Sequence, residues 1–93
     1  MRKDEKEHIE KVVSLGCIAC SVVGYDTPQV EVHHIGNGTM GKRASNFEVI
    51  PLCAQHHRLG GSGVAVHAGR KSFEAVYGTE RELLAQVTGL INE

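Results

Sequence analysis

Two short pairs of metal-ligating residues constrain this chain more than any other feature. Cys17 and Cys20 form a Cys-x-x-Cys pair, and Cys53 and His56 form a Cys-x-x-His pair. A two-residue gap lets both side chains of a pair reach one ion, and a set of four such ligands is typical of a structural Zn²⁺ site. The alternative is that the cysteines are small buried apolar residues. Because all three cysteines of the chain fall in these pairs, we expect a structural zinc ion bound by all four residues.

The amount of apolar material makes such an ion useful. The chain has 93 residues, which is enough for one domain over 1–93, but only 4% of them are aromatic and none is Trp. A small domain with a thin core gains folding energy from a bound structural ion. An odd number of cysteines also argues against a closed disulfide framework.

The sequence lacks the features of a membrane or exported protein. No apolar run approaches the 18 or so residues that a membrane-spanning helix needs. The first seven residues, MRKDEKE, are too charged for a signal peptide. We therefore predict a cytoplasmic protein with no membrane partner.

Local patterns predict a mixed order of helices and strands. Apolar spacing predicts an N-terminal helix over 4–15, ended by Gly16, and C-terminal helices over 67–92. Within the second region we expect a helix over 67–77 that directs Phe73, Val76 and Tyr77 inward. The sequence TERE at 79–82 has the form of a capping box. Leu83, Leu84, Val87, Leu90 and Ile91 follow it at helical spacing.

The central segment, 16–59, is expected to hold the strands. The β-branched runs at 22–23 and 30–32 flank turn chemistry at 25–28 and predict a hairpin. A Gly-rich loop follows at 36–46. We then expect an extended piece at 47–50, which Pro51 ends, and a short helix over 54–59.

Charge and histidine are concentrated in the middle of the chain. Residues 31–71 carry five Lys or Arg against two acidic residues, and they hold five of the six histidines. The net charge of −1 therefore averages a basic centre against acidic ends. Each of His33, His34, His57 and His67 could separately be a surface residue or be satisfied by a backbone carbonyl. Four of them beside a zinc site instead favour a second metal site.

The same residues resemble a known nuclease class. The run VHHI at 32–35, a Gly-rich basic loop, Asn46 and the run PLCAQHH at 51–57 are similar to HNH endonucleases of the ββα-metal class. The resemblance covers residues 17–57. It implies an α+β fold, a small zinc-stabilised ββα-metal (HNH) fold with flanking helices.

A second resemblance extends over about residues 15–90. The runs GKRAS at 41–45, PLCAQHH at 51–57, VHAGR at 66–70 and FEAVYGTE at 73–80 are similar to the phage recombination-enhancement nucleases. That family is HNH-like and is associated with RecA filaments on DNA. The resemblance implies DNA and a RecA filament as partners, and a bacterial host cell as the location of a phage-encoded member.

The resemblance also implies roles for individual residues. His34 is the expected general base, because imidazole ordinarily titrates near neutral pH, with a pKa of about 6.5. Asn46 is the candidate to hold its other ring nitrogen. His33, His57 and His67 are the expected ligands of a catalytic Mg²⁺, Mn²⁺ or Zn²⁺, although His67 could contact DNA instead. A regular strand would direct His33 and His34 to opposite faces. For both to serve one site we expect the backbone to bend there, which the nearby Gly36 and Gly38 would allow.

The basic residues complete the functional hypothesis. We expect phosphate contacts, and hence DNA binding with little sequence preference, from Lys42, Arg43, Arg58, Arg70 and Lys71. The alternative for these five is a solvated basic face. The leading hypothesis is a metal-dependent DNA endonuclease that hydrolyses phosphodiester bonds with a histidine base. The alternative is a non-catalytic zinc-binding module that binds DNA or a recombination protein.

Overall fold

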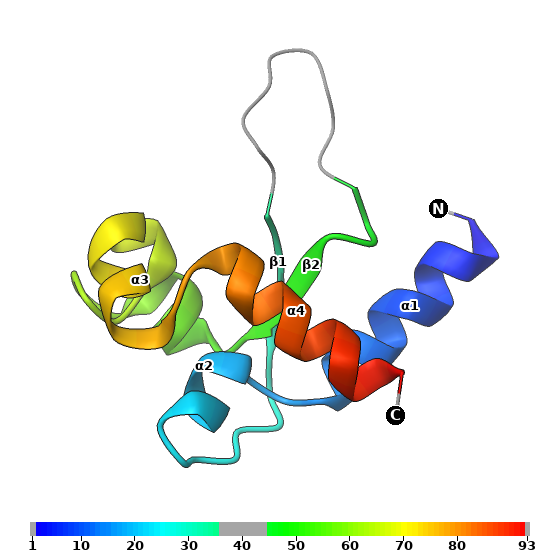
Figure 1. Ribbon diagram of the computed structural model, residues 1–93, viewed down its shortest axis with the longest axis horizontal. Helices are drawn as coiled ribbons and strands as arrows, with labels where there is room; N and C mark the ends of the chain where they lie inside the picture. The colour runs from blue at the N-terminus through cyan, green and yellow to red at the C-terminus, as the bar shows by residue number, and fades with distance from the viewer. Residues whose placement is uncertain (1, 36–44, 93) are drawn as a thin grey trace.

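The computed structural model describes residues 2–35 and 45–92 of the chain, which form a small mixed structure of helices and one two-stranded sheet (Figure 1). The elements, in chain order, are α1 (Lys3–Ser14), α2 (Ile18–Val22), β1 (Glu31–His34), β2 (Val49–Leu52), the π-helical turn η1 (Gln55–Leu59), the 3₁₀ turn η2 (Val66–Ala68), α3 (Arg70–Tyr77) and α4 (Glu80–Ile91). Gly36, Gly38, Lys42 and Arg43, for which the sequence predicted a role, lie outside the described residues.

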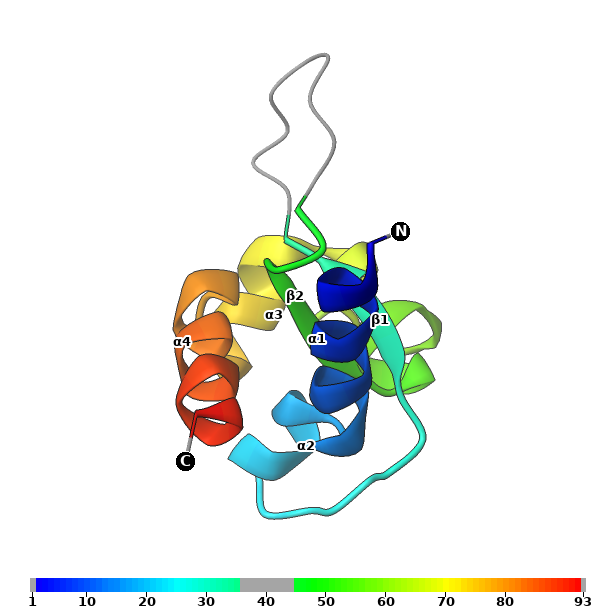
Figure 2. The same cartoon turned by 90° about the vertical axis from the view of Figure 1, so that its right-hand side faces the viewer.

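The sheet is the centre of the packing. Strands β1 and β2 are antiparallel, and helices α1, α2 and α4 all contact β2. In Figure 2, α4 lies to the left of the strands and α1 lies in front of them, and these two helices also contact each other. All four residues of β2 are buried as a result. The core around it includes Val12 of α1, Phe73 of α3, and Leu83 and Val87 of α4.

The hairpin predicted over 22–32 is wrong. Residues Ile18–Val22 form α2 instead, and β1 pairs with β2 across the segment that follows Ile35. The Cys17 side chain caps α2 by accepting a hydrogen bond from the Cys20 backbone N–H at 3.4 Å. This cap, together with burial of Ile18 and Ala19, outweighs the β-propensity of a run of only two valines.

Pro51 lies inside β2, where we expected it to end an extended piece. Ile35 donates a backbone hydrogen bond to Glu48 across the hairpin at 3.0 Å. Hydrogen-bonded and non-hydrogen-bonded pairs alternate along an antiparallel ladder, so the pair Val32 and Pro51 is non-hydrogen-bonded. The nitrogen of Pro51 therefore faces away from β1, and the strand loses no ladder bond at this position.

Helices form in the regions where the sequence predicted them, but they begin or end at other residues. Helix α1 ends one residue before the predicted limit, and Gly16 follows it with φ +78°. The predicted helix over 67–77 is divided into η2 and α3, because Gly69 interrupts it with φ +159°. Within α3, Phe73 is buried and Tyr77 is partly buried, but Val76 is exposed.

The capping box is present at the start of α4. Thr79 accepts from the Glu82 backbone N–H at 3.1 Å, and Glu82 accepts from the Thr79 backbone N–H at 2.8 Å. One residue of the apolar stripe predicted on this helix, Leu90, is exposed to solvent. Within the described ranges 2–35 and 45–92, no helix has the length and apolar character required to cross a bilayer.

Candidate metal centres

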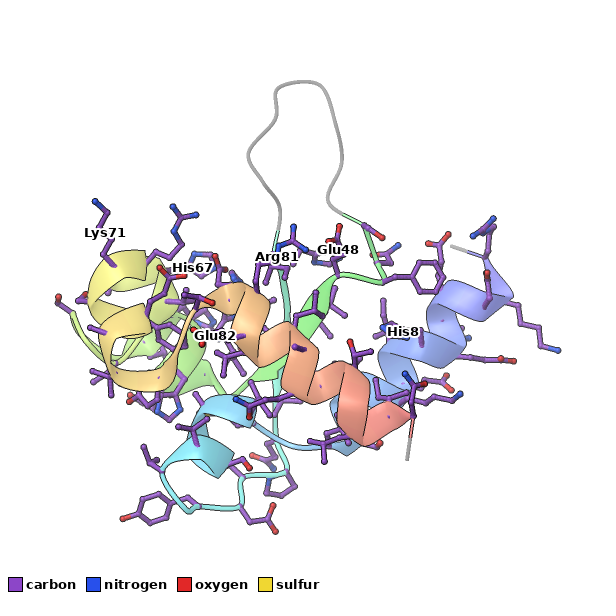
Figure 3. All side chains as sticks on the ribbon, in the orientation of Figure 1. His8, Glu48, His67, Lys71, Arg81 and Glu82 are labelled. Carbon is purple, nitrogen blue, oxygen red and sulfur yellow. The ribbon has the colours of Figure 1, made fainter. Side chains whose placement is uncertain are left out.

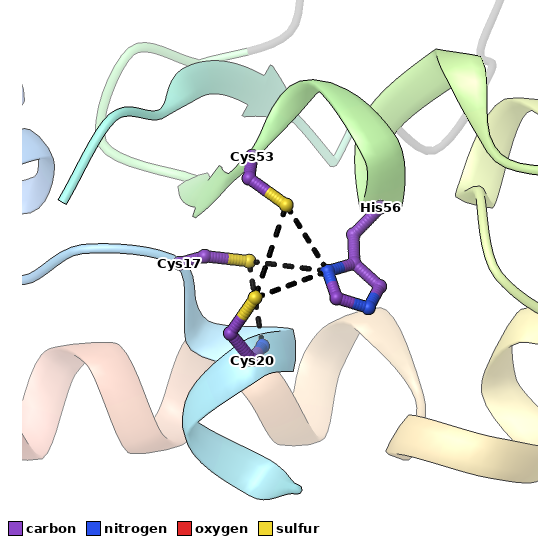
Figure 4. A group of neighbouring side chains, drawn as sticks. All are labelled: Cys17, Cys20, Cys53 and His56. Carbon is purple, nitrogen blue, oxygen red and sulfur yellow. Dashed lines mark hydrogen bonds between the residues drawn. The ribbon is translucent and has the colours of Figure 1, made fainter. Parts of the chain in front are cut away.

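The two ligand pairs meet at one point of the structure (Figure 4). Cys17 and Cys20 lie at the start of α2, Cys53 follows β2, and His56 lies in η1. The Nδ1 atom of His56 lies 3.6 Å from Cys17 Sγ, 3.4 Å from Cys20 Sγ and 3.2 Å from Cys53 Sγ. The Cys20 and Cys53 sulfurs are 3.8 Å apart. The three thiols are buried and His56 is partly buried, so the cluster is enclosed.

These distances fit a tetrahedral ion. With Zn–S near 2.3 Å and Zn–N near 2.0 Å, a tetrahedron has S···S edges of about 3.8 Å and S···N edges of about 3.5 Å. The observed distances between the four ligand atoms, 3.2–3.8 Å, lie around these values. Burial raises the pKa of the Cys17 thiol to about 12, so a bare thiolate is unfavourable there. A cation at the centre would supply the opposing charge, and the Cys₃His cluster can therefore hold a metal such as zinc.

Two further side chains contact this cluster and were not singled out as site residues from the sequence. Thr27 donates to Cys20 Sγ at 3.1 Å, and the Tyr77 hydroxyl lies 3.1 Å from His56 Nε2. With a metal bound at Nδ1 of His56, the ring hydrogen would be on Nε2, which would donate to the tyrosine oxygen. Burial lowers the pKa of His56, which favours the neutral form that binds metal. Such outer contacts orient metal ligands.

A second cluster contains His33, His57 and His67. Their ring nitrogens lie within 4.8 Å of one another, and the Nε2 atoms of His57 and His67 are 3.0 Å apart. His33 is buried, His57 is partly buried and His67 is exposed, so this cluster is open to solvent on one side. An open, imidazole-lined position differs from the enclosed Cys₃His cluster in the way that catalytic sites differ from structural ones.

Two carboxylates form hydrogen bonds with two of these imidazoles. Glu31 Oε1 lies 2.8 Å from His57 Nδ1, and Glu80 Oε2 lies 2.5 Å from His33 Nε2. A carboxylate only accepts, so His57 carries its hydrogen on Nδ1 and presents an Nε2 lone pair towards His67. Burial lowers the pKa of His33 although Glu80 opposes that effect. Burial therefore favours the neutral, metal-binding form of His33.

Glu31 and Glu80 carry no local signal of this role in the sequence. Glu31 lies between the two valines of the short run at 30–32, and Glu80 is one of two acidic residues in the first turn of α4. Each meets its histidine only in the folded chain, across 26 and 47 residues respectively. The sequence holds one hint of the role of Glu31. It lies two positions before His33, and alternate residues of a strand share a face.

His34 and Asn46 lie beside each other at the end of the hairpin where the connecting segment joins the two strands. His34 Nε2 is 2.8 Å from Asn46 Oδ1, and Asn46 Nδ2 donates to Glu5 Oε2 of α1 at 2.6 Å. The bend expected at His33 and His34 is absent from β1, since both residues pair regularly with Ile50 and Val49. Their side chains therefore leave opposite faces of the strand. Residue 34 is the last of β1 and is exposed.

Three of the predicted DNA-binding residues are described, and they lie in two environments. The Arg58 guanidinium forms two short contacts with the Glu31 carboxylate, at 2.8 and 3.0 Å, and its hydrogen bonds hold the pKa of Glu31 down at about 2. Arg70 and Lys71 are exposed at the start of α3, and Figure 3 shows Lys71 on the same side of the molecule as His67. Arg70 lies 3.8 Å from Glu80.

Comparison with known proteins identifies the family. YdfU, an uncharacterised protein of Escherichia coli strain K12, is 32% identical to this chain over 83 residues, which are 89% of this chain and 22% of YdfU. The chain thus spans about a fifth of the length of that relative. A family model described as "Recombination enhancement, RecA-dependent nuclease" matches residues 2–92. The chain belongs to the recombination-enhancement, RecA-dependent nuclease family.

Proposed function

We propose that the chain is an HNH-type, metal-dependent DNA endonuclease that acts with RecA filaments in recombination. The family name supports a nuclease and a connection with RecA. The observation that carries the HNH assignment is the neighbourhood of His33 and His34. One of these adjacent residues joins an open cluster of three imidazoles, and the other is held by an asparagine at the exposed end of the same strand.

The two clusters would have different tasks. The enclosed Cys₃His cluster would hold a structural zinc ion that joins α2 to the end of β2 and to η1. The open cluster of His33, His57 and His67 would hold a second divalent ion, Mg²⁺, Mn²⁺ or Zn²⁺. When bound there, that ion supplies positive charge against the phosphoryl oxygen and the leaving oxygen.

His34 would act as the general base. Its Nε2–H is donated to Asn46, and the Nδ1 lone pair accepts a proton from water. The oxygen of that water forms a bond to phosphorus as the bond to the 3′ oxygen breaks, and the leaving oxygen takes a proton from solvent. Because His33 and His34 leave opposite faces of β1, the phosphodiester would lie across the exposed end of the strand. Arg70 and Lys71 would contact neighbouring phosphates.

Plasmid nicking by a His34→Ala variant tests this assignment. The assay covers Mg²⁺, Mn²⁺, Ni²⁺ and Zn²⁺, each with and without RecA filaments on DNA. We expect nicking to fall at least about 100-fold, the contribution of a general base. The melting temperature and DNA binding should stay unchanged, because His34 is exposed. Wild-type nicking rates in the variant would contradict the mechanism. DNA binding by the wild type without cleavage under any of these conditions would favour the non-catalytic module.

A further inference from the structure

We infer that Glu5 of helix α1 is a positioning residue for His34, acting through Asn46, and this inference rests on the proposed role of His34 as a base. The three side chains form a continuous line of hydrogen bonds. Glu5 Oε2 accepts from Asn46 Nδ2 at 2.6 Å, and Asn46 Oδ1 lies 2.8 Å from His34 Nε2. Glu5 is 41 residues away from Asn46 in the chain and belongs to a different element.

The chemistry of the three groups fixes the direction of this line. A carboxylate has no hydrogen to donate, so Glu5 must face the amide nitrogen of Asn46 rather than its oxygen. The amide oxygen then has to face His34. Because that oxygen only accepts, the hydrogen of neutral His34 must be on Nε2, and its Nδ1 keeps a lone pair. Glu5 thereby selects the tautomer that a base acting through Nδ1 requires.

The surroundings hold both ends of the line in place. The Asn46 turn is closed by a Ser45 carbonyl that accepts from the Glu48 backbone N–H at 3.1 Å. The next residue, Phe47, packs against His8 of α1 with ring centroids 5.2 Å apart. Helix α1 thus contacts this turn at two positions one helical turn apart. The other oxygen of Glu5, Oε1, accepts from the exposed Arg2 side chain at 3.1 Å, a contact that leaves the bond between Oε2 and Asn46 untouched.

Replacing Glu5 with glutamine tests the direction of the line with almost no change in shape. A glutamine amide can donate or accept, so Asn46 would no longer be held in one orientation. The first measurement is the ¹⁵N shift of the His34 ring nitrogens at alkaline pH, where imidazole is neutral. We expect the hydrogen to reside on Nε2 in the wild type, and to be shared between the two nitrogens in Glu5→Gln.

The second measurement is steady-state cleavage by the same variant. We expect kcat to fall by about 10-fold to 100-fold, the effect that outer hydrogen-bond partners of functional histidines have elsewhere. KM should stay unchanged, because Glu5 is not a DNA contact in this proposal. In an Asn46→Ala background, Glu5→Gln should change neither the tautomer nor kcat further, since Glu5 acts through Asn46.

Arg2→Gln is the matched control. It removes the Arg2 contact with Glu5 and leaves Glu5 able to accept from Asn46, so the tautomer and kcat should match the wild type. An unchanged tautomer in Glu5→Gln, an equal effect in Arg2→Gln, or additive losses with Asn46→Ala would each overturn the inference. A wild type without any cleavage would overturn the proposed function, whereas the tautomer measurement would still decide whether Glu5 sets the state of His34.

Discussion

Glu80 shows how much of the second cluster depends on residues outside the ligand set. Its carboxylate accepts from His33 Nε2, so the remaining nitrogen of that ring, Nδ1, keeps its lone pair. Its side chain is only 14% exposed, which protects the contact from water. The bond fixes both the rotation and the tautomer of a buried imidazole, as outer carboxylates of metal sites commonly do.

Glu80→Gln should weaken divalent-metal binding at the three-histidine cluster. A glutamine amide can present its nitrogen instead of its oxygen to His33, so the ring loses its fixed tautomer. We expect the affinity for Co²⁺ to fall by about 10-fold to 100-fold. A Co²⁺ titration of the zinc-loaded protein, followed by visible absorption, measures this. Glu10→Gln, an exposed change in α1, is the control. Equal affinity in the two variants would contradict the role of Glu80.

At the scale of elements, the capping box of α4 has a measurable pH dependence. Hydrogen bonds from Thr79, chiefly from its backbone N–H, lower the pKa of Glu82. A carboxyl with a lowered folded-state pKa stabilises the fold above its ordinary pKa, about 4.3, and loses that effect as pH falls through its lowered value.

The free energy of unfolding should therefore respond to acid differently in Glu82→Gln. The neutral amide has no charge to lose, so the stability advantage of the wild type over the variant should shrink as pH falls below about 4.3. Urea unfolding of both proteins at several pH values measures the difference. Because both proteins contain the same Cys₃His and three-histidine clusters, acid effects on those clusters cancel. A difference that stays constant with pH would contradict the role of the charged cap.

Elements whose signal is local were predictable from the sequence, and elements whose signal is tertiary were not. The capping box and the two ligand pairs depend on spacings of three residues, which the sequence states directly. The hairpin was misplaced because two adjacent valines have some β-propensity, whereas the Cys17 cap that favours α2 is visible only in the fold. Glu5 is one acidic residue among several in α1, and nothing local distinguishes it from its neighbours.

At the scale of the whole molecule, the Cys₃His cluster joins segments that the thin core holds weakly. Its ligands come from two regions more than 30 residues apart, and Tyr77 connects it to α3. Structural zinc binding contributes about 10–16 kcal/mol in small domains, whereas a whole domain is stable by about 5–15 kcal/mol. Loss of a zinc ion bound at this cluster would therefore cost about as much as, or more than, the whole stability of a domain of this kind.

Removal of the zinc ion proposed for the Cys₃His cluster should unfold the chain. We expect a strong chelator, or Cys53→Ala, to abolish the cooperative thermal transition seen by circular dichroism. His57→Ala is the control, because it removes a ligand of the open cluster and leaves all four ligands of the enclosed one. A cooperative melt at the wild-type temperature after chelation or in Cys53→Ala would show that the cluster does not stabilise the fold.

Pro51 has a consequence for the order of the hairpin as well as for its shape. A one-residue slip between the strands would either turn its nitrogen towards β1, where a ladder donor is missing, or turn β1 over. In the second case His33 and His34 would exchange faces. His34 would then lie on the side of Glu80, and His33 on the side of Asn46. The slipped pairing is costly in both forms. Pro51 makes no polar contact with either histidine. It nevertheless determines which of His33 and His34 lies beside Glu80 and which lies beside Asn46.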